Sequence, residues 1–385
     1  MPLDGLRVVA LEQAVAGPFC SRQLADMGAE VVKIERPPDG DPSRAYDAAM
    51  RGQSAYFAWL NRGKRSVSLD VSDAGGREIL GALVARADIL VHNLAPGAVE
   101  RMGVGYADVA ERHPRLIWCG ISGYGPDGPR RTSKAYDMLV QAEAGVISVT
   151  GTPDAPAKAG ISIADISAGL YAYSSILTAL IHRGRTGKGT RIDISMLECL
   201  TEWMSAPISV WQGTGRAPAR AGVRHNMIVP YGAYRCAGTD AVMFAVQNDR
   251  EWRRFCERVM EMPELFHDAR FVTNSLRLEH RGALEALIEA RFRPHPADVV
   301  RGWLEAADIP TATVNEVPAV AAHPQLTSRA RWTTVASPSG QIPALLPPHN
   351  LFGVPPMMGA VPALGEHTDE VLAEIERARL GTETQ

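Results

Sequence analysis

A single carboxylate, Asp165, stands at the front of a long apolar stretch and is the strongest candidate for chemistry in this sequence. It lies in the run GISIADISAGLYAYSSILTALIHRGRTGKGTRIDISMLE, from Gly160 to Glu198, which predicts a helix entered near Asp165. The N–H groups and the macrodipole at a helix entry stabilise negative charge, so we expect this carboxylate to stay ionised at neutral pH and to act as a nucleophile. Because Asp is also a preferred N-cap residue, a purely capping role is the alternative.

Short apolar runs alternate with segments of helical spacing over the first half of the chain. We interpret the runs LRVVALE, EVVKIER, SVSLDV, ADILVHNL and RLIWCGIS as strands, and the segments CSRQLADMGA and GREILGALVARA as helices between them. This βαβ alternation predicts an α/β fold with a Rossmann-like, mostly parallel sheet and helices on both faces. In such folds, ligands bind beyond the carboxyl ends of the strands.

Two glycine-containing turns lack the spacing of nucleotide-binding motifs. The first, VAGPFCS, has no GxGxxG fingerprint, so the sequence predicts no NAD site. The second, GRTGKGT at Gly184 to Thr190, has glycines too close together for a phosphate loop of the GxxxxGK[ST] type. We interpret it as the exit turn of the Asp165 helix, leading into the strand TRIDISM.

The rhythm of the sequence changes after about residue 200, which predicts a second domain. We expect a large Rossmann-like domain at residues 1–200, a linker rich in Gly, Pro and Arg at 201–230, and a small α+β domain at 231–325. Residues 326–385 are predicted to form a return linker and a C-terminal helix that packs on the large domain.

Composition excludes several classes of protein. With 385 residues and a formal charge of −3, the chain lacks the basic surplus needed for binding nucleic acid or an anionic membrane. Five scattered Cys without a CxxC pair suit a reducing cytoplasm, and the ten His show no metal-binding spacing, so we expect a cytoplasmic protein without a metal site. The sequence suggests no signal peptide, and no stretch was expected to approach the length of a membrane span.

Several motifs, in order along nearly the whole chain, resemble those of the family III CoA-transferases, which include formyl-CoA and carnitine-type CoA-transferases. They are LDGLRVVALEQAVAGPFCSRQLADMGAEVVKIERP from Leu3, YDMLVQAEAG at Tyr136 to Gly145, LYAYSSILTALIHRGRTGKG after Asp165, and LGEHTDEVL at Leu364 to Leu372. The resemblance implies a large CoA-binding domain built from both ends of the chain, a small domain between them, and a homodimer of two interlocked subunits. It also implies coenzyme A as the acyl-CoA substrate and Asp165 as the residue that carries covalent intermediates.

The same resemblance implies a set of residues that support catalysis and bind CoA. Oxyanion donors are expected in the turn of Val15, Ala16 and Gly17, with Gln13 as a side-chain candidate. The phosphates of CoA require cationic and polar side chains on one rim, and isolated Arg and Lys are otherwise ordinary surface residues. The matching positions are Arg36, Lys64, Arg65, Asn93, Leu94, Arg101 and Lys134.

Tyr136 and Asp137 bear on the choice between two activities, since the related acyl-CoA racemases carry a His-Asp pair where this chain has Tyr-Asp. Racemisation needs two acid/base groups at one α-carbon, so the Tyr favours CoA transfer. Tyr136 simply packed at a helix start, and Asp137 as a helix cap or an orienting group, are the alternatives.

The passage AGVRHNMIVPYG stands where formyl-CoA-type relatives carry a glycine-rich flap, which argues against formate and oxalate chemistry. Arg224 and His225 in this passage resemble the pair expected in members that act on small dicarboxylates, and we predict that they bind the acceptor carboxylate. Two exposed linker residues are the alternative. Succinyl-CoA would then be the donor, and itaconate, mesaconate or citramalate the acceptor.

Three hypotheses of function therefore remain at the level of sequence. The first is a CoA-transferase with Asp165 as the covalent nucleophile. The second is a 2-methylacyl-CoA racemase, which would exchange an α-proton and form no enzyme thioester. The third is a CoA-binding protein without turnover, in which replacing Asp165 would remove only a helix cap, worth roughly 1 kcal/mol.

Overall fold

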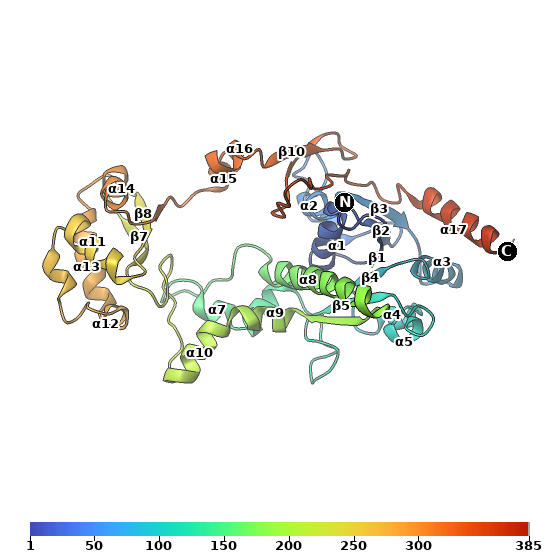
Figure 1. Cartoon of the computed structure of the whole chain (residues 1–385), viewed down its shortest axis with the longest axis horizontal. Helices are drawn as coiled ribbons and strands as arrows, with labels where there is room; N and C mark the ends of the chain where they lie inside the picture. Colours follow the sequence, from blue (N-terminus) through green and yellow to red (C-terminus); the bar gives the residue numbers. More distant parts are fainter. Residues whose placement is uncertain (384–385) are drawn as a thin grey trace. The chain divides into compact units, whose positions relative to one another are not determined.

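A computed structural model describes residues 1–383, and the chain forms two compact units (Figure 1). Unit 1 contains Met1–Ala144, Gly160–Met204 and the described chain from Gln325 onward, and unit 2 contains Gly145–Ala159 and Ser205–Pro324. Residues 145–159, which the sequence places in the large domain, belong with unit 2. The reason is that Thr152 O accepts a hydrogen bond from Arg220, and Gly151 O accepts one from the Gly222 N–H.

Unit 1 is built on a six-stranded sheet in which every pairing is parallel. Its strands are β1 (Arg7–Leu11), β2 (Glu30–Glu35), β3 (Lys64–Ser68), β4 (Ile89–His92), β5 (Ile117–Ser122) and β6 (Arg191–Ser195), in the order β3-β2-β1-β4-β5-β6. The expected α/β fold with a parallel sheet is confirmed. Because the strand order reverses between β1 and β4, a crevice is expected beyond the carboxyl ends of these two strands.

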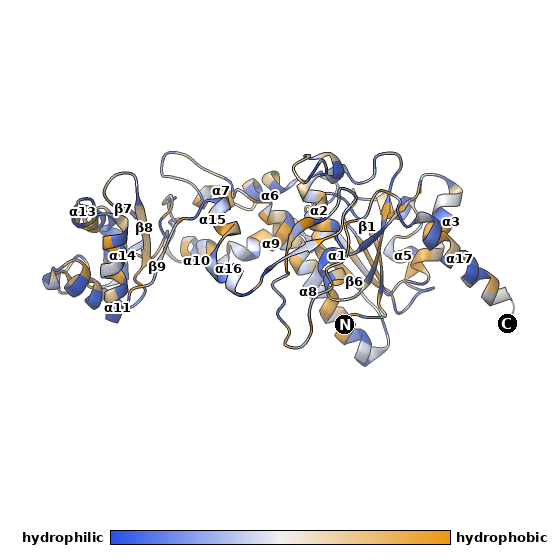
Figure 2. Cartoon of the chain, turned by 90° about the horizontal axis from the view of Figure 1, so that it is seen from above, coloured by the Kyte–Doolittle hydropathy of each residue, from blue (hydrophilic) through white to orange (hydrophobic). Residues whose placement is uncertain are grey.

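Helices cover both faces of this sheet, and its strands are coloured largely hydrophobic around β1 (Figures 1 and 2). On one face, α1 (Ala16–Asp26) packs against α8 (Ile163–Thr186) and against β1, β2 and β4. On the other face, α3 (Ala74–Val84) and α17 (Thr368–Glu383) close a core that includes Leu80, Leu90 and Ile375. The remaining short helices of unit 1 are η1 (Pro42–Ala45), α2 (Ala55–Asn61), α4 (Ala98–Arg101), α5 (Tyr106–Val109), α6 (Asp137–Glu143) and α9 (Met196–Trp203).

The long helix α8 corrects one expectation from the sequence. With 24 residues, it is long and apolar enough to cross a membrane by length and composition, although no such stretch was predicted. It packs instead against α1 and β5, and Arg183 on it is buried and ion-paired with Asp88. The helix ends at Gly187, which adopts φ +73°, so the GRTGKGT run is confirmed as a helix-exit turn.

The C-terminal helix α17 is fastened to the edge strand β3. The Ser66 N–H donates to His367 Nδ1 at 3.3 Å, and the Ser68 N–H donates to Thr368 Oγ1 at 3.0 Å. These bonds occupy N–H groups that an edge strand would otherwise present to solvent or to another chain. The GEHTDE motif therefore has a structural role.

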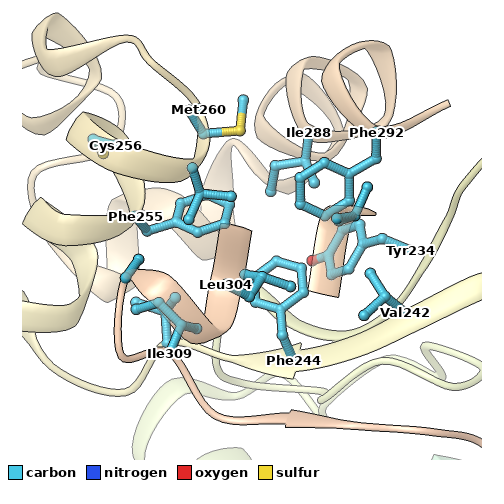
Figure 3. Packing of buried hydrophobic residues seen from close by; sticks show 14 of the residues in the cluster. Tyr234, Val242, Phe244, Phe255, Cys256, Met260, Ile288, Phe292, Leu304 and Ile309 are labelled. Atoms are coloured by element: carbon cyan, nitrogen blue, oxygen red, sulfur yellow. The ribbon is translucent and has the colours of Figure 1, made fainter. Parts of the chain in front are cut away.

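Unit 2 has its own sheet and core (Figure 3). Strands β7 (Tyr231–Arg235), β8 (Ala241–Ala245) and β9 (Thr311–Ala312) pair in antiparallel fashion. Buried aromatic side chains of Tyr234, Phe244, Phe255 and Phe292 pack together between this sheet and the helices. The helical segments of unit 2 are α7 (Val146–Val149), α10 (Ser205–Thr214), α11 (Asp249–Arg254), η2 (Phe255–Val259), η3 (Pro263–Phe266), α12 (Asn274–Glu279), α13 (Arg281–Phe292), α14 (Ala297–Ala306) and α15 (Val317–Ala321).

The return passage contains structure that the sequence did not reveal. After α16 (Pro324–Ser328), strands β10 (Trp332–Val335) and β11 (Ile342–Leu345) form an antiparallel hairpin. Val335 and Ile342 of this hairpin bury their side chains against Phe57 of α2. The Pro-rich composition favoured an irregular linker, but these contacts supply a hydrophobic reason for local order.

The seam between α1 and α8 generates a prediction about stability. A Cβ atom at Gly169 of α8 would lie 2.6 Å from Ala16 O and 3.0 Å from Phe19 Cδ1, so Gly169→Ala should force the two helices apart. We expect a loss of about 1–3 kcal/mol in the free energy of unfolding, measured by denaturant titration.

Gly184→Ala in the same helix is the matched control. No atom lies within 4 Å of its Cβ position, so it should leave stability unchanged or raise it by up to about 1 kcal/mol. Equal effects of the two substitutions would show that helix propensity, rather than the close approach, determines the result.

Candidate active site

The turn after β1 lies at the point where the strand order reverses. Asn93, directly after the neighbouring strand β4, holds this turn, because the Gln13 N–H donates to Asn93 Oδ1 at 2.9 Å and Asn93 Nδ2 donates to Gln13 O at 2.8 Å. The side chain of Gln13 is exposed. Asn93, predicted to bind CoA, thus uses its amide to fix the backbone of the predicted oxyanion turn.

Ala14, next in the turn, adopts a left-handed backbone conformation with φ +61°. Its N–H donates to Asp41 Oδ1 at 3.0 Å, and Asp41 also accepts from Ser43 N at 2.8 Å and from Lys33 Nζ at 2.8 Å. A non-glycine residue at positive φ is uncommon and often marks a functional site. The turn is therefore held in an unfavourable conformation by a buried carboxylate.

The start of α1 leaves backbone N–H groups without intrahelical acceptors next to this turn. Val15 is the N-cap residue, without a side-chain cap, and the first helical bond runs from Phe19 N to Val15 O at 2.7 Å. The N–H groups of Ala16 and Gly17 precede that bond, in the part of a helix where donors have no intrahelical acceptor. They are suitable donors for an oxyanion, as the sequence predicted.

A buried charge cluster lies behind the turn. Ion pairs link Lys33 and Lys64 to Glu12, and Lys33 to Asp41. A further pair of Glu35 and the half-buried Arg44 lies beside them, because the Asp41 N–H donates to Glu35 Oε2. Lys64 Nζ donates to Glu12 Oε1 at 2.6 Å, and Ser21 Oγ donates to Glu12 Oε2 at 2.6 Å. The equal numbers of acids and bases cancel formally, which the cost of burying unpaired charge requires.

Asp165, in the first turn of α8, does not cap its own helix. Asp137 takes that role, because its Oδ1 accepts from Ala164 N at 2.8 Å and from Asp165 N at 3.3 Å. Gln141 Nε2 donates to the other oxygen of Asp137 at 2.7 Å. The sequence offered Asp137 as the cap of the helix that begins MLVQAEAG, but its side chain bonds to the first N–H groups of α8 instead. The Asp165 carboxylate makes no hydrogen bond within residues 1–383.

The pKa of Asp165 differs from the sequence prediction, which was that this carboxylate stays ionised at neutral pH. Burial, and next the negative charge of Asp137, raise the pKa of Asp165 to about 7. The helix entry does not hold this carboxylate ionised, because the nearest N–H groups are bonded to Asp137 instead. The carboxyl group of Asp165 therefore titrates near neutral pH, as a group poised for reaction often does.

The turn and Asp165 belong to the same region of unit 1. Gly169, one helical turn after Asp165, lies against Ala16 O at the start of α1. Tyr46 supplies a second link, since burial and then the charges of Asp41 and Asp165 raise the pKa of its hydroxyl. Tyr46, Asp41 and Lys33 were missed at the level of sequence, where only the polar PPDGD segment after β2 hinted at a functional loop.

Three of the other residues predicted to bind CoA are exposed, and a fourth is half-buried. Arg36 follows β2, Leu94 follows β4, and Arg101 closes α4. The side chains of Arg36, Arg101 and Lys134 are exposed, and Leu94 is half-buried. Tyr136 is 70% exposed, so it is not the packed side chain of the alternative interpretation.

Two residues predicted to bind CoA instead form hydrogen bonds and ion pairs within unit 1. Lys64 is buried, and its ammonium group also donates to Asn61 Oδ1 at 2.9 Å and Pro18 O at 3.1 Å. Burial lowers its pKa to about 8, which the charge of Glu12 opposes. Arg65 pairs with Glu30 and Glu374. A cationic side chain in the sequence does not reveal whether an internal carboxylate already pairs with it.

The predicted acceptor-binding pair lies in unit 2. Arg224 forms ion pairs with Glu285 and Glu289, and its guanidinium lies 4.8 Å from the ring centre of Tyr234. Its charge is therefore already balanced within unit 2, which departs from the predicted grip on a substrate.

His225 is held differently. Its Nδ1 accepts from Met227 N and Ile228 N, both at 3.0 Å, and its ring stacks on Tyr231. Burial and the charge of Arg281 lower its pKa. Since Nδ1 is the acceptor, the neutral ring carries its proton on Nε2, which makes Nε2 a hydrogen-bond donor.

Known proteins resemble this chain along nearly all of its length. Residues 3–368 match the model of a family described as CoA-transferase family III. An acetyl-CoA:oxalate CoA-transferase of Acetobacter aceti is 37% identical over 85% of this chain and 84% of the relative. A succinyl-CoA:glutarate CoA-transferase of Mus musculus is 34% identical over 98% of this chain and 87% of the relative.

A solved structure shows the same fold. The crystal structure of a CAIB/BAIF family protein from Brucella suis superimposes with a TM-score of 0.84 and 34% sequence identity, covering 97% of this chain and 99% of that one. The similarity spans the residues of both units.

The raised pKa of Asp165 predicts how stability depends on pH. The folded protein keeps a proton on Asp165 from pH 4 to about 7, where the unfolded chain has lost it, so this group lowers the free energy of unfolding as pH rises. Asp165→Asn cannot titrate. Between pH 5 and pH 8, the free energy of unfolding of Asp165→Asn should rise by about 2–4 kcal/mol relative to that of the wild type, measured by denaturant titration.

Asp127→Asn, at an exposed turn, is the control and should show no such trend. A constant difference between Asp165→Asn and wild type over this pH range would contradict the raised pKa.

Proposed function

Because the chain belongs to CoA-transferase family III, as its motifs predicted, we propose that it moves CoA from succinyl-CoA to a small dicarboxylic acid through covalent intermediates on Asp165. The observation that carries this proposal is the Asp165 carboxylate, which is free of helix capping and lies one turn from the contact between α8 and the start of α1. The relative from Mus musculus is named for succinyl-CoA and glutarate, a dicarboxylate, which supports this donor and acceptor class. The relative from Acetobacter aceti is named for oxalate, the acceptor against which the missing glycine-rich flap argued.

In the first half-reaction, an oxygen of Asp165 attacks the carbonyl carbon of the donor thioester. The C–S bond breaks, the CoA thiolate leaves, and a mixed anhydride joins the donor acyl group to Asp165. The thiolate then attacks the aspartyl carbonyl, the donor acid departs as a carboxylate, and CoA is left as a thioester of Asp165. Each step is easier than direct exchange between two carboxylates, and the thioester is never hydrolysed.

The second half-reaction reverses this order with the acceptor. The acceptor carboxylate attacks the aspartyl thioester, which releases the thiolate and forms an anhydride between the acceptor and Asp165. The thiolate then attacks the acceptor carbonyl, so the acceptor leaves as its CoA ester and Asp165 is regenerated as a carboxylate. The attacking form of Asp165 is the ionised one, so activity should rise as pH passes through about 7.

The oxyanions that form at each carbonyl need fixed donors. The N–H groups of Ala16 and Gly17 at the start of α1, with the exposed side chain of Gln13, supply them in this proposal. Asn93 contributes by holding the Gln13 backbone rather than by contacting CoA.

The CoA phosphates are assigned to the exposed cations of the same sheet edge. Arg36, Arg101 and Lys134 can pair with the 3′-phosphate and the pyrophosphate, and Leu94 offers an apolar contact. In unit 2, we assign the acceptor carboxylate to His225 Nε2 and assign Arg224 to the structure of the unit.

The racemase alternative has less support. Tyr136 stands where the racemases carry His, and Asp137 is engaged in capping α8, so the described residues 1–383 do not place the His-Asp pair of the racemases beside Asp165. We further propose the cytoplasm as the location and an interlocked homodimer as the assembly. Exposed apolar side chains in unit 1, among them Met138, Leu139 and Ile161, are surfaces that a second subunit could cover.

The covalent relay predicts an adduct that can be weighed. Wild-type enzyme mixed with succinyl-CoA and no acceptor should gain the mass of a CoA thioester. Borohydride or hydroxylamine should convert the modified Asp165 to the alcohol or the hydroxamate. Intact-protein mass spectrometry with peptide mapping measures both.

Asp165→Asn should form no adduct and lose turnover. An unmodified wild-type protein that exchanges the α-proton of a 2-methylacyl-CoA with deuterium from solvent would instead establish the racemase.

Acceptor binding predicts a selective effect of His225→Asn. The Asn Oδ1 can accept from Met227 N and Ile228 N as His Nδ1 does, but no group replaces the Nε2 donor. The KM for dicarboxylate acceptors such as glutarate, mesaconate, itaconate and citramalate should rise about 10–100-fold, because hydrogen bonds to charged groups contribute about 1.5–3 kcal/mol.

The KM for a monocarboxylate such as acetate should change little. His267→Asn, at an exposed site in unit 2, is the matched control. An equal rise in KM for both kinds of acceptor would show that His225 does not bind the acceptor carboxylate.

A further inference from the structure

Asp41 is a buried carboxylate that no step of the proposed reaction uses. It lies between β2 and η1, is 3% exposed, and binds three donors, which are the N–H groups of Ala14 and Ser43 and the ammonium group of Lys33. The bonds to Ser43 and Lys33 fix the carboxylate itself. The bond to Ala14 then connects this fixed carboxylate to the turn after β1.

Ala14 needs such a partner because of its backbone conformation. With φ +61°, its Cβ meets a steric penalty that glycine would not, and residues other than glycine adopt positive φ in only a few per cent of cases. The penalty arises because Cβ comes too close to the carbonyl oxygen that follows it. A charge-assisted hydrogen bond to a buried carboxylate is large enough to offset it.

Lys33 also holds the backbone of Glu12, the residue before the turn. Its ammonium group donates to Glu12 O at 3.3 Å as well as to Asp41 Oδ2 at 2.8 Å. Glu12 and Ala14 are thus tied to one fully buried cation and its partner, while Asn93 holds Gln13 between them. Three successive residues of the backbone are fixed from outside the turn.

The direction of the next N–H groups follows from this arrangement. Ala14 is followed by Val15, the N-cap of α1, and then by Ala16 and Gly17. A change of the Ala14 φ to a negative value would rotate the peptide groups that follow it. The donors at the start of α1 would then point elsewhere.

We propose that Asp41 is a positioning residue for acyl transfer, which holds Ala14 in its left-handed conformation and so aims the N–H groups of Ala16 and Gly17 at the reacting carbonyl. This inference rests on the proposed function. Asp41 contacts no substrate and acts through the turn.

Asp41→Asn tests the inference, since Asn has the same shape but turns an NH2 group toward Lys33 and leaves only a neutral oxygen to accept from the N–H groups of Ala14 and Ser43. We expect kcat to fall about 10–100-fold, because small displacements of catalytic groups have effects of this size. The KM for succinyl-CoA should stay within about twofold, since the exposed cations assigned to CoA are untouched. Single-turnover formation of the Asp165 adduct should slow by the same factor as kcat.

Asp26→Asn is the matched control. Asp26 is also a buried, ion-paired carboxylate, bonded to Arg22 and Arg62 at the far end of α1. Its replacement should lower thermal stability and leave kcat near the wild-type value. A general loss of rigidity would lower kcat in both variants and would overturn the specific role of Asp41.

The double variant Asp41→Asn, Ala14→Gly separates positioning from structural damage. Glycine adopts positive φ about as readily as negative φ, so the turn should regain its conformation for a large fraction of the time. We expect kcat to recover up to about tenfold over Asp41→Asn alone. No recovery would mean that the loss has another origin.

If Asp41→Asn does not fold, Ala14→Val tests the inference in its place. A β-branched residue strongly disfavours positive φ, and this substitution leaves the buried charges in place. We expect a several-fold loss of kcat, and an unchanged kcat would overturn the inference. An Asp165 adduct that forms at the normal rate in Asp41→Asn would overturn the role of Asp41 and leave the proposed function intact. No adduct in wild type would overturn both.

Discussion

The need to balance charge inside unit 1 determines much of its architecture. Six ionisable side chains lie together behind the turn after β1, and an unpaired charge there would be very costly, so each acid is matched by a base within hydrogen-bonding reach. The matching fixes more than the side chains, because Lys33 and Asp41 also bond to the backbone of Glu12 and Ala14. The pairing of the buried charges therefore also fixes the backbone conformation of the turn.

The two carboxylates at the entry of α8 show how neighbouring groups of one chemical type acquire different properties. Asp137 accepts backbone N–H groups and acts as the cap, while burial and the charge of Asp137 raise the pKa of Asp165 to about 7. Gly169 then lets α8 approach α1 closely, which brings the carboxylate near the N-terminal donors of that helix. The packing of α8 against α1 thus places the proposed nucleophile, Asp165, near the proposed donors at the start of α1.

The sequence predicted what depends on local pattern and family motifs, and failed where distant residues determine the outcome. The βαβ order, the Asp165 helix and its exit at Gly187 follow from periodicity and turn chemistry. The burial of Lys64 with Glu12 depends on residues 52 positions apart, and the pairing of Arg224 with Glu285 depends on residues 61 apart. The pKa of Asp165 was misjudged for the same reason, since Asp137 precedes it by 28 residues.

The fastening of β3 by the last helix has a consequence for biosynthesis. The N–H groups of Ser66 and Ser68 obtain their partners from His367 and Thr368, which lie 301 and 300 residues later in the chain. On the ribosome, therefore, the sheet can pair all six strands by residue 195 and still carry an open edge until almost the whole polypeptide has been made. During that interval, the edge strand of a nascent chain is a site at which a chaperone could bind or neighbouring nascent chains could pair wrongly.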